Sequence, residues 1–168
     1  RSINPANPRK NNTGGHIIKI KVNEFDHTSE EAKWELFLMA GNPKKQKTSY
    51  HKETTTNGWF ASPKDGLIDT NERLWITTDG AEKSGYSDGL WICDTKGKGK
   101  GLSRSFLKSP NGGKVSSPII TSDESTMICS INHPGKNSTY QTPSTRWPDF
   151  NESIPPRPTI IAIDINNL

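Results

Sequence analysis

Residues 58–80 read GWFASPKDGLIDTNERLWITTDG, and this stretch decides the fold. It contains a short apolar strand at 66–68, a polar corner at 69–72 and a second strand at 73–78. Two short strands joined by a tight polar corner are typical of an antiparallel β-hairpin. The stretch therefore predicts the strand, corner and strand unit from which the rest of the chain is built.

An acidic residue stands at each end of this hairpin, Asp65 at the start of the first strand and Asp79 after the second. In an antiparallel hairpin these two ends lie side by side, so we expect both carboxylates on one rim of the sheet. Carboxylate oxygens are the ligands of hard cations such as Ca²⁺. A simpler interpretation stays open, because each aspartate precedes a glycine and Asp-Gly is a common turn dipeptide.

The composition of the 168-residue chain favours one domain of short strands joined by many turns. Only 29% of the residues are apolar, and there are 14 glycines and 12 prolines, so a thick helical core is not expected. The net charge of +4 comes from 22 basic and 18 acidic residues, which permits anionic ligands without requiring nucleic acid. The lysine clusters at 44–47 and 96–100 are typical of solvated loop tips.

The two cysteines, Cys93 and Cys129, have neither a C-x-x-C spacing nor a nearby histidine pair, which disfavours a zinc site. A disulfide is possible, but both fall in strand patterns, where cysteine packs as a small apolar side chain. No run has the length of a membrane-spanning helix, and no signal peptide is present. Because residue 1 is arginine, we expect a piece of a longer chain, from which a targeting segment could have been lost.

Apolar alternation predicts further strands on both sides of the hairpin. They are expected at 16–22, 33–41, 88–94, 102–107 and 158–165, with 42–57 as a long exposed loop. Residues 29–32 could instead begin a helix, although a strand at 33–41 better explains pairing with 16–22. The last strand, 158–165, is apolar enough that we expect both of its faces to be buried.

The strand, acidic corner and strand pattern occurs twice, since Thr70–Thr78 aligns with Ser122–Ser130, 52 positions later. Four short strands between 66 and 107 make one sheet of the size of a propeller blade, and a second copy favours repeated sheets over a single sandwich. The sequence therefore predicts an all-β chain of about three antiparallel sheets, a partial β-propeller.

Nucleic-acid binding is the least favoured function. The tryptophans that could serve as base-stacking platforms fall mostly in strand patterns, so they are expected in the core. These residues are Trp34, Trp59, Trp75 and Trp91.

Five blocks of sequence, spread over nearly the whole chain, resemble PhoX-type alkaline phosphatases in their order. The blocks are NPRKNNTGGHII at 7–18, WELFLMAG at 34–41, RLWITTDG at 73–80, NHPG at 132–135 and WPD at 147–149. The resemblance covers only the C-terminal portion of that family. It implies that residues 1–168 are the C-terminal part of a single, closed propeller domain of roughly six blades, exported to the periplasm or the cell exterior.

The resemblance also implies chemistry. Members of the family hydrolyse phosphate monoesters, with calcium and iron ions in the central channel, and metal ions supply positive charge and an activated nucleophile for such a reaction. Asp65 matches the acidic residue of the family's S-P-D-G-L block and is implied as a Ca²⁺ ligand, with Asp79 close to the same channel. The Fe³⁺ ligands, which include a cysteine, would lie outside this chain, so neither Cys93 nor Cys129 is assigned that role.

Arg9 and His133 are candidates to contact phosphate oxygens or to orient a ligand. Each has an alternative interpretation: a lone arginine is usually at the surface, and a histidine in His-Pro-Gly is often a turn residue.

Three positions depart from the family pattern. Lys114 stands where the family has a metal-binding glutamate, Lys64 is inserted before Asp65, and Arg146 is an additional basic residue before the Trp-Pro-Asp block. A cation at residue 114 would repel calcium.

Two functions therefore stay open: a metal-dependent phosphomonoesterase, and a noncatalytic, diverged propeller scaffold that binds an anion beside Lys64 and Lys114. We expect residues 1–168 alone to be inactive, because about three blades cannot close a ring. The specific substrate and the oligomeric state are open.

Overall fold

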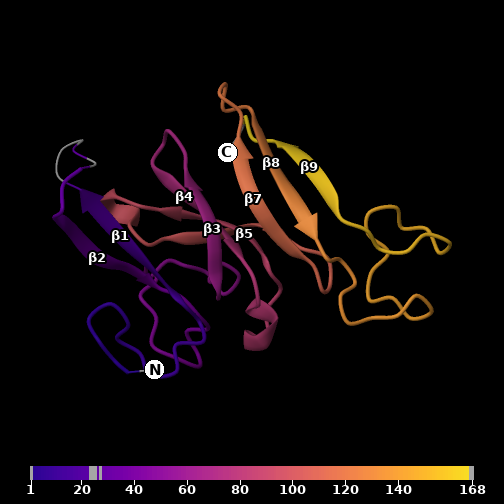
Figure 1. Cartoon of the computed structure of the whole chain (residues 1–168), viewed down its shortest axis with the longest axis horizontal. Coiled ribbons are helices and arrows are strands. Elements are labelled where there is room, and N and C mark those ends of the chain that lie inside the picture. Colours follow the sequence, from indigo (N-terminus) through magenta and orange to yellow (C-terminus); the bar gives the residue numbers. More distant parts are fainter. Residues whose placement is uncertain (1, 23–25, 27, 167–168) are drawn as a thin grey trace.

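The computed structural model describes residues 2–22, 26 and 28–166, which form nine strands in three antiparallel sheets (Figure 1). The first sheet consists of β1 (His16–Val22) and β2 (Ala32–Met39). The second has the order β3 (Pro63–Ile68), β4 (Arg73–Thr78), β5 (Gly89–Asp94) and β6 (Ser103–Lys108). The third has the order β7 (Lys114–Ile120), β8 (Thr126–Asn132) and β9 (Thr159–Asp164).

Helical structure in the described residues is limited to two short 3₁₀ turns, η1 (Ala81–Ser84) and η2 (Gly97–Gly99). None of the helices in this part of the chain is long and apolar enough to cross a membrane. The predicted all-β class with three antiparallel sheets is confirmed. The pairing of β1 with β2 shows that the alternative of a helix beginning at 29–32 is wrong.

The second sheet lies between the other two and is buried on both faces. Trp75 of β4 pairs with Ile92 of β5, and both face the third sheet. The next pair along the strands, Ile76 with Trp91, faces the first sheet. Because successive side chains point to opposite faces, a strand covered on both sides needs an unbroken apolar run. This requirement explains the Leu-Trp-Ile sequence that occurs in both strands.

Two apolar clusters hold the three sheets together. The cluster between the second and third sheets contains Trp75, Leu90, Ile92, Val115, Met127, Cys129, Ile131 and Ile165. The cluster between the first and second sheets contains Phe37, Leu38, Ala40, Phe60, Ile76, Trp91 and Cys93. Burial of one large apolar side chain stabilises a fold by about 1.5–3 kcal/mol, so these contacts determine how the sheets are placed.

Each cluster contains one cysteine, and both cysteines are free. Cys93 and Cys129 lie on opposite sides of the second sheet, so the disulfide alternative is wrong. Burial raises the pKa of Cys93 to about 12 and that of Cys129 to about 11. Both thiols are therefore protonated at neutral pH and pack as apolar groups.

The 52-residue repeat is present in the backbone. The corner between β3 and β4 has a hydrogen bond from Glu72 N to Asp69 O, and the corner between β7 and β8 has one from Glu124 N to Thr121 O. Both glutamates have a φ of 58°, in the left-handed region. The two corners also touch, because Thr70 N donates to Glu124 Oε1 at 3.2 Å.

The first strand of each repeat carries a β-bulge at an equivalent place. The bulge of β3 follows Pro63, which pairs with Thr78, and the bulge of β7 follows Ser116, which pairs with Ser130. Thr78 and Ser130 are the same 52 positions apart. A bulge bends its strand and changes the direction of the side chains beside it. The two repeats therefore share the same local distortion in their first strands.

Two predictions of burial are wrong. The outer face of β9 is open: Ile161 and Ile163 pack on the cluster, but Ile160 is 79% exposed, because no sheet of the described chain covers that face. Trp34, expected in the core, is 49% exposed. Trp34 lies in the first half of β2, and the side chains of the first four residues of that strand are all exposed.

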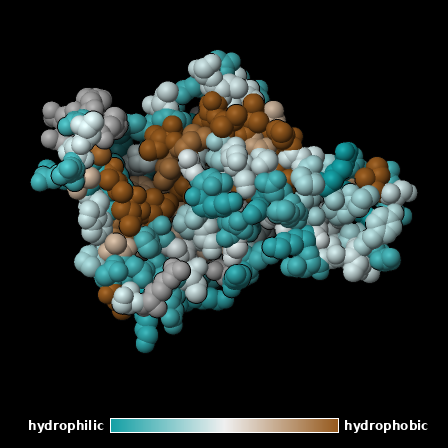
Figure 2. Space-filling view, in the orientation of Figure 1, coloured by the Kyte–Doolittle hydropathy of each residue, from teal (hydrophilic) through white to brown (hydrophobic). Residues whose placement is uncertain are grey.

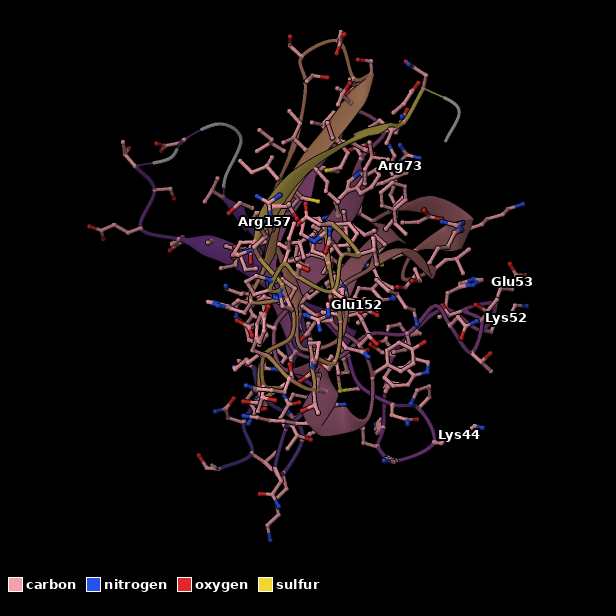
Figure 3. The ribbon with its side chains drawn as sticks, turned by 90° about the vertical axis from the view of Figure 1, so that its right-hand side faces the viewer. Lys44, Lys52, Glu53, Arg73, Glu152 and Arg157 are labelled. Carbon is pink, nitrogen blue, oxygen red and sulfur yellow. The ribbon has the colours of Figure 1, made fainter. Side chains whose placement is uncertain are left out.

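Segment 42–57 contains no helix or strand, as predicted. Figure 3 shows Lys44, Lys52 and Glu53 extending outward from it, as expected of a solvated loop. Tyr50 is the exception: its hydroxyl donates to Phe60 O at 2.6 Å, and burial raises its pKa. The loop is therefore anchored to the segment that precedes β3.

Apolar side chains also reach the surface along the sheets, where Figure 2 shows them gathered on the upper part of the molecule. The exposed large apolar residues in strands include Ile20, Ile68, Ile119 and Ile160. Apolar side chains on open sheet faces are typical of surfaces that contact another part of a protein.

The alternation along β9 predicts unequal effects of two matched substitutions in the 168-residue chain. Ile163→Ala should lower the free energy of unfolding by about 2 kcal/mol, because it removes methyl groups that pack on the cluster. Ile160→Ala should change it by less than about 0.5 kcal/mol. Urea unfolding of both variants measures the difference, and equal losses would show that β9 is buried on both faces.

Candidate functional site

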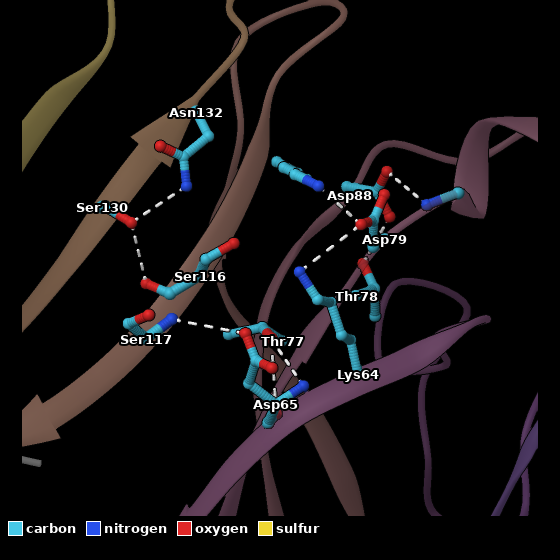
Figure 4. Close-up of polar contacts among 12 residues, drawn as sticks. Lys64, Asp65, Thr77, Thr78, Asp79, Asp88, Ser116, Ser117, Ser130 and Asn132 are labelled. Atoms are coloured by element: carbon cyan, nitrogen blue, oxygen red, sulfur yellow. Dashed lines mark hydrogen bonds and ion pairs between the residues drawn. The ribbon is translucent and has the colours of Figure 1, made fainter.

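The candidate site is the rim where β3 begins, β4 ends and β7 begins (Figure 4). Asp79 directly follows β4, and its backbone N–H donates to Ser62 O, just before β3, at 3.1 Å. Strand β7 packs against both β3 and β4. The two ends of the hairpin are thus adjacent, and the third sheet brings its own first residue, Lys114, to the same place.

Asp79 is paired with two lysines. Its Oδ2 atom accepts a hydrogen bond from Lys114 Nζ at 2.6 Å, and Lys64 Nζ lies 3.6 Å from the same oxygen. The hydrogen bond from Lys114 lowers the pKa of Asp79 and raises that of Lys114. The carboxylate is therefore ionised at neutral pH, and its charge is compensated by ammonium groups of the chain itself.

Asp65 lies in the bulge of β3 and has different partners. Its backbone N–H donates to Thr77 Oγ1 at 3.1 Å, which ties the bulge to β4. Its Oδ2 atom accepts a long hydrogen bond, 3.4 Å, from Ser117 N in the bulge of β7. The rim therefore contains both predicted carboxylates, but Asp65 faces a backbone amide of β7 whereas Asp79 faces ammonium groups.

Asp88 is the residue that orients this rim, and sequence analysis missed it. It is 5% exposed, and its carboxylate accepts from Thr78 Oγ1 at 2.7 Å, Gly80 N at 2.9 Å and Ala81 N at 3.0 Å. These donors flank Asp79 on both sides, so Asp88 fixes the turn that carries it. The available signal was the tripeptide Asp-Gly-Leu, which occurs at both 65–67 and 88–90.

Small polar side chains continue the rim along β7 and β8. Ser130 Oγ donates to Ser116 O at 3.2 Å, and Asn132 Nδ2 donates to Ser130 Oγ at 3.1 Å. The Ser116 hydroxyl is buried and has no hydrogen-bond partner among the described residues. Apart from Lys114, these side chains of β7 and β8 are uncharged.

The donor set does not by itself fit a metal ion. Within residues 2–22, 26 and 28–166, no three His, Cys, Asp or Glu side chains come together. Calcium takes six to eight oxygen ligands, and two ammonium groups beside Asp79 would repel it. The predicted ligand roles of Asp65 and Asp79 stay predictions, and they would require further oxygen ligands from outside this chain.

Arg9 is buried, so the alternative of a surface arginine is wrong. Its guanidinium donates to Ala40 O at 2.8 Å, Lys47 O at 2.6 Å and Gly15 O at 2.7 Å, and also to Asn12 Oδ1. Burial lowers its pKa. These bonds tie the N-terminal segment to the end of β2, and a role in phosphate binding stays a prediction.

His133 is exposed in a turn after β8, with a φ of 53°, and its carbonyl accepts from Lys136 N at 3.1 Å. This geometry agrees with the turn interpretation. No hydrogen bond among the described residues joins His133 or Arg9 to Asp65 or Asp79, whereas Asp65 and Asp79 share one rim (Figure 4). The phosphate contact of His133 also stays a prediction.

The contacts of Asp88 predict a structural role. In the 168-residue chain, Asp88→Ala should lower the free energy of unfolding by about 2–3 kcal/mol, since it leaves buried donors without an acceptor. Chemical denaturation measures this loss. The matched substitution Glu152→Ala, at an exposed residue (Figure 3), should have an effect below about 0.5 kcal/mol. Equal effects would contradict the orienting role.

The lowered pKa of Asp79 predicts how stability depends on pH. The Asp79–Lys114 pair should contribute fully above the ordinary carboxyl pKa, and this contribution should disappear as the pH falls through the lower pKa of the folded state. Asp79→Asn should therefore lose less stability than the wild type between pH 6 and pH about 2. Urea unfolding at both pH values tests this, and parallel curves would contradict it.

Comparisons with known proteins agree with the resemblance seen in the sequence. The family model for alkaline phosphatase PhoX matches residues 1–135. The solved structure of Pseudomonas fluorescens PhoX in complex with vanadate, a transition state analogue, is similar to 97% of this chain with a TM-score of 0.78 and 28% sequence identity. The chain spans 28% of that protein's length, and no curated protein matches it. The chain belongs to the PhoX alkaline phosphatase family.

Proposed function

We propose that the protein carrying this chain hydrolyses phosphate monoesters, and that residues 1–168 are the C-terminal part of its closed propeller domain. The observation that carries the proposal is the PhoX family match over residues 1–135. The open faces of the first and third sheets support the proposal of a larger domain, because further sheets would cover exposed residues such as Ile20 and Ile160.

The rim of β3, β4 and β7 is the part of this chain that we propose to face the substrate. Phosphoryl transfer requires positive charge around the developing charge of the phosphate, and Lys64 and Lys114 place two ammonium groups there. Neither Asp65 nor Asp88 has an ion pair among the described residues, but Asp88 is buried and accepts three hydrogen bonds, whereas Asp65 is half-buried and its side chain accepts one long hydrogen bond. Ca²⁺ and Fe³⁺, which the family resemblance implies, would need ligands from outside residues 1–168.

Location follows from the family alone. We propose that the full protein is exported to the periplasm or the cell exterior, where a phosphatase of this family meets phosphate monoesters. Fractionation of cells expressing the full-length protein tests this.

A second function is favoured by one observation, the pairing of Lys114 with Asp79. A lysine in place of a metal-binding glutamate suits a noncatalytic propeller that holds an anion beside Lys64 and Lys114. A protein of this kind would have the same fold and the same positive charge at the rim, but it would not hydrolyse phosphate monoesters.

If the proposed phosphomonoesterase function is correct, the full-length protein should release phosphate from an aryl phosphate in the presence of calcium. Asp65→Ala should lower kcat/KM by at least about 100-fold, because it removes the rim carboxylate that is neither buried nor ion-paired. The matched control is Asp164→Ala on β9. Within the part of the chain that the structure describes, the side chain of Asp164 accepts hydrogen bonds from Asn166 alone. The control variant should retain activity.

Circular dichroism should show that both variants keep the β-structure of the wild type. If the full-length protein releases no phosphate with or without calcium, and titration calorimetry detects phosphate binding that Lys64→Ala weakens, the noncatalytic alternative is correct.

A further inference from the structure

The rim contains nearly balanced charges at close range. The carboxylates belong to Asp65, Asp79 and Asp88, and the ammonium groups belong to Lys64 and Lys114. Asp88 is buried and accepts three hydrogen bonds, one from Thr78 at the end of β4 and two from Gly80 and Ala81 in the turn that follows. Both lysines face Asp79, whose single negative charge leaves one positive charge in excess beside it.

Lys114 is held in place by the sheet. It is the first residue of β7 and pairs with Asn132 of β8, while β7 packs on β4. Its Nζ is 2.6 Å from Asp79 Oδ2, the length of a strong charge-assisted hydrogen bond. The side chain of Lys114 is also less exposed, at 24%, than that of Lys64, at 41%. Lys114 is thus the built-in partner of Asp79.

A divalent cation on Asp79 would compete for the same oxygen atom. Oδ2 takes the hydrogen bond from Lys114 and also faces Lys64. An ammonium group neutralises a carboxylate as a metal ion does, but it is covalently attached, donates hydrogen bonds and needs no ring of oxygen ligands. The uncharged side chains beside it, Ser116, Ser130 and Asn132, are too few to bind calcium without carboxylates.

We propose that the ammonium group of Lys114 takes the place of a metal ion at Asp79, so that this rim is held by an internal cation and binds no divalent metal through Asp79. The proposal does not depend on catalysis, because it concerns what holds β7 against the end of β4. It further implies that the lysine is the barrier to metal binding, and that a carboxylate at residue 114 removes this barrier.

The test uses the full-length protein and counts calcium ions per chain by mass spectrometry after dialysis against calcium. Asp79→Asn should bind as much calcium as the wild type. Lys114→Glu should bind about one more ion, because it exchanges a repelling ammonium for a second carboxylate beside Asp79. The double variant Lys114→Glu with Asp79→Asn should lose that ion.

Lys98→Glu makes the same change of charge on an exposed turn and should leave the calcium content unchanged. A calcium-dependent rise in Tm should occur in Lys114→Glu beyond that of the wild type. The proposal is overturned if Asp79→Asn lowers the calcium content, if Lys114→Glu gains none, or if Lys98→Glu gains as much. Because the readout is metal content, these results are independent of whether the protein releases phosphate.

Discussion

The burial of the second sheet on both faces is the constraint on which the rest of the structure depends. β4 and β5 place tryptophan and isoleucine in cross-strand pairs on each face of the sheet, so exposure of either face to water would be unfavourable. The first and third sheets cover them, and this requirement fixes where β7 lies relative to β3 and β4. The site is a consequence of that packing: Lys114 meets Asp79 because the third sheet docks through β7, although the two residues are 35 positions apart in the chain.

The repeat provides the local geometry of the rim. In both copies a bulge interrupts the first strand opposite the same position of the second, and in the first copy this bulge carries Asp65. Its partner, Ser117, lies in the bulge of the second copy, with a φ of 52°. Two equivalent distortions therefore face each other across neighbouring sheets. One provides a carboxylate and the other a backbone N–H, which is why a rim built from repeats is not symmetric in its chemistry.

Local patterns predicted the hairpin, the four-stranded sheet, the repeat and the position of Asp65 and Asp79 on one rim, because alternation and corners depend on residues close together in sequence. Burial was predicted less well. Whether the second face of β9 is covered depends on a neighbouring sheet and not on the apolar content of the strand, and the same holds for Trp34. The roles of Asp88 and Arg9 could not be predicted from residue type, since most of their partners are backbone groups that every residue has.

The two carboxylates that the sequence presents as a pair are therefore electrostatically different. Asp79 is neutralised by Lys114 and Lys64, and an ammonium group cannot polarise a phosphoryl oxygen as a Lewis acid or bind a water molecule as a nucleophile. Asp65 has one long hydrogen bond and no ion pair in the described chain, so it retains lone pairs for a ligand. In the role that we propose for it, Lys114 keeps the cohesion that a metal ion would give to the rim but separates Asp79 from metal chemistry.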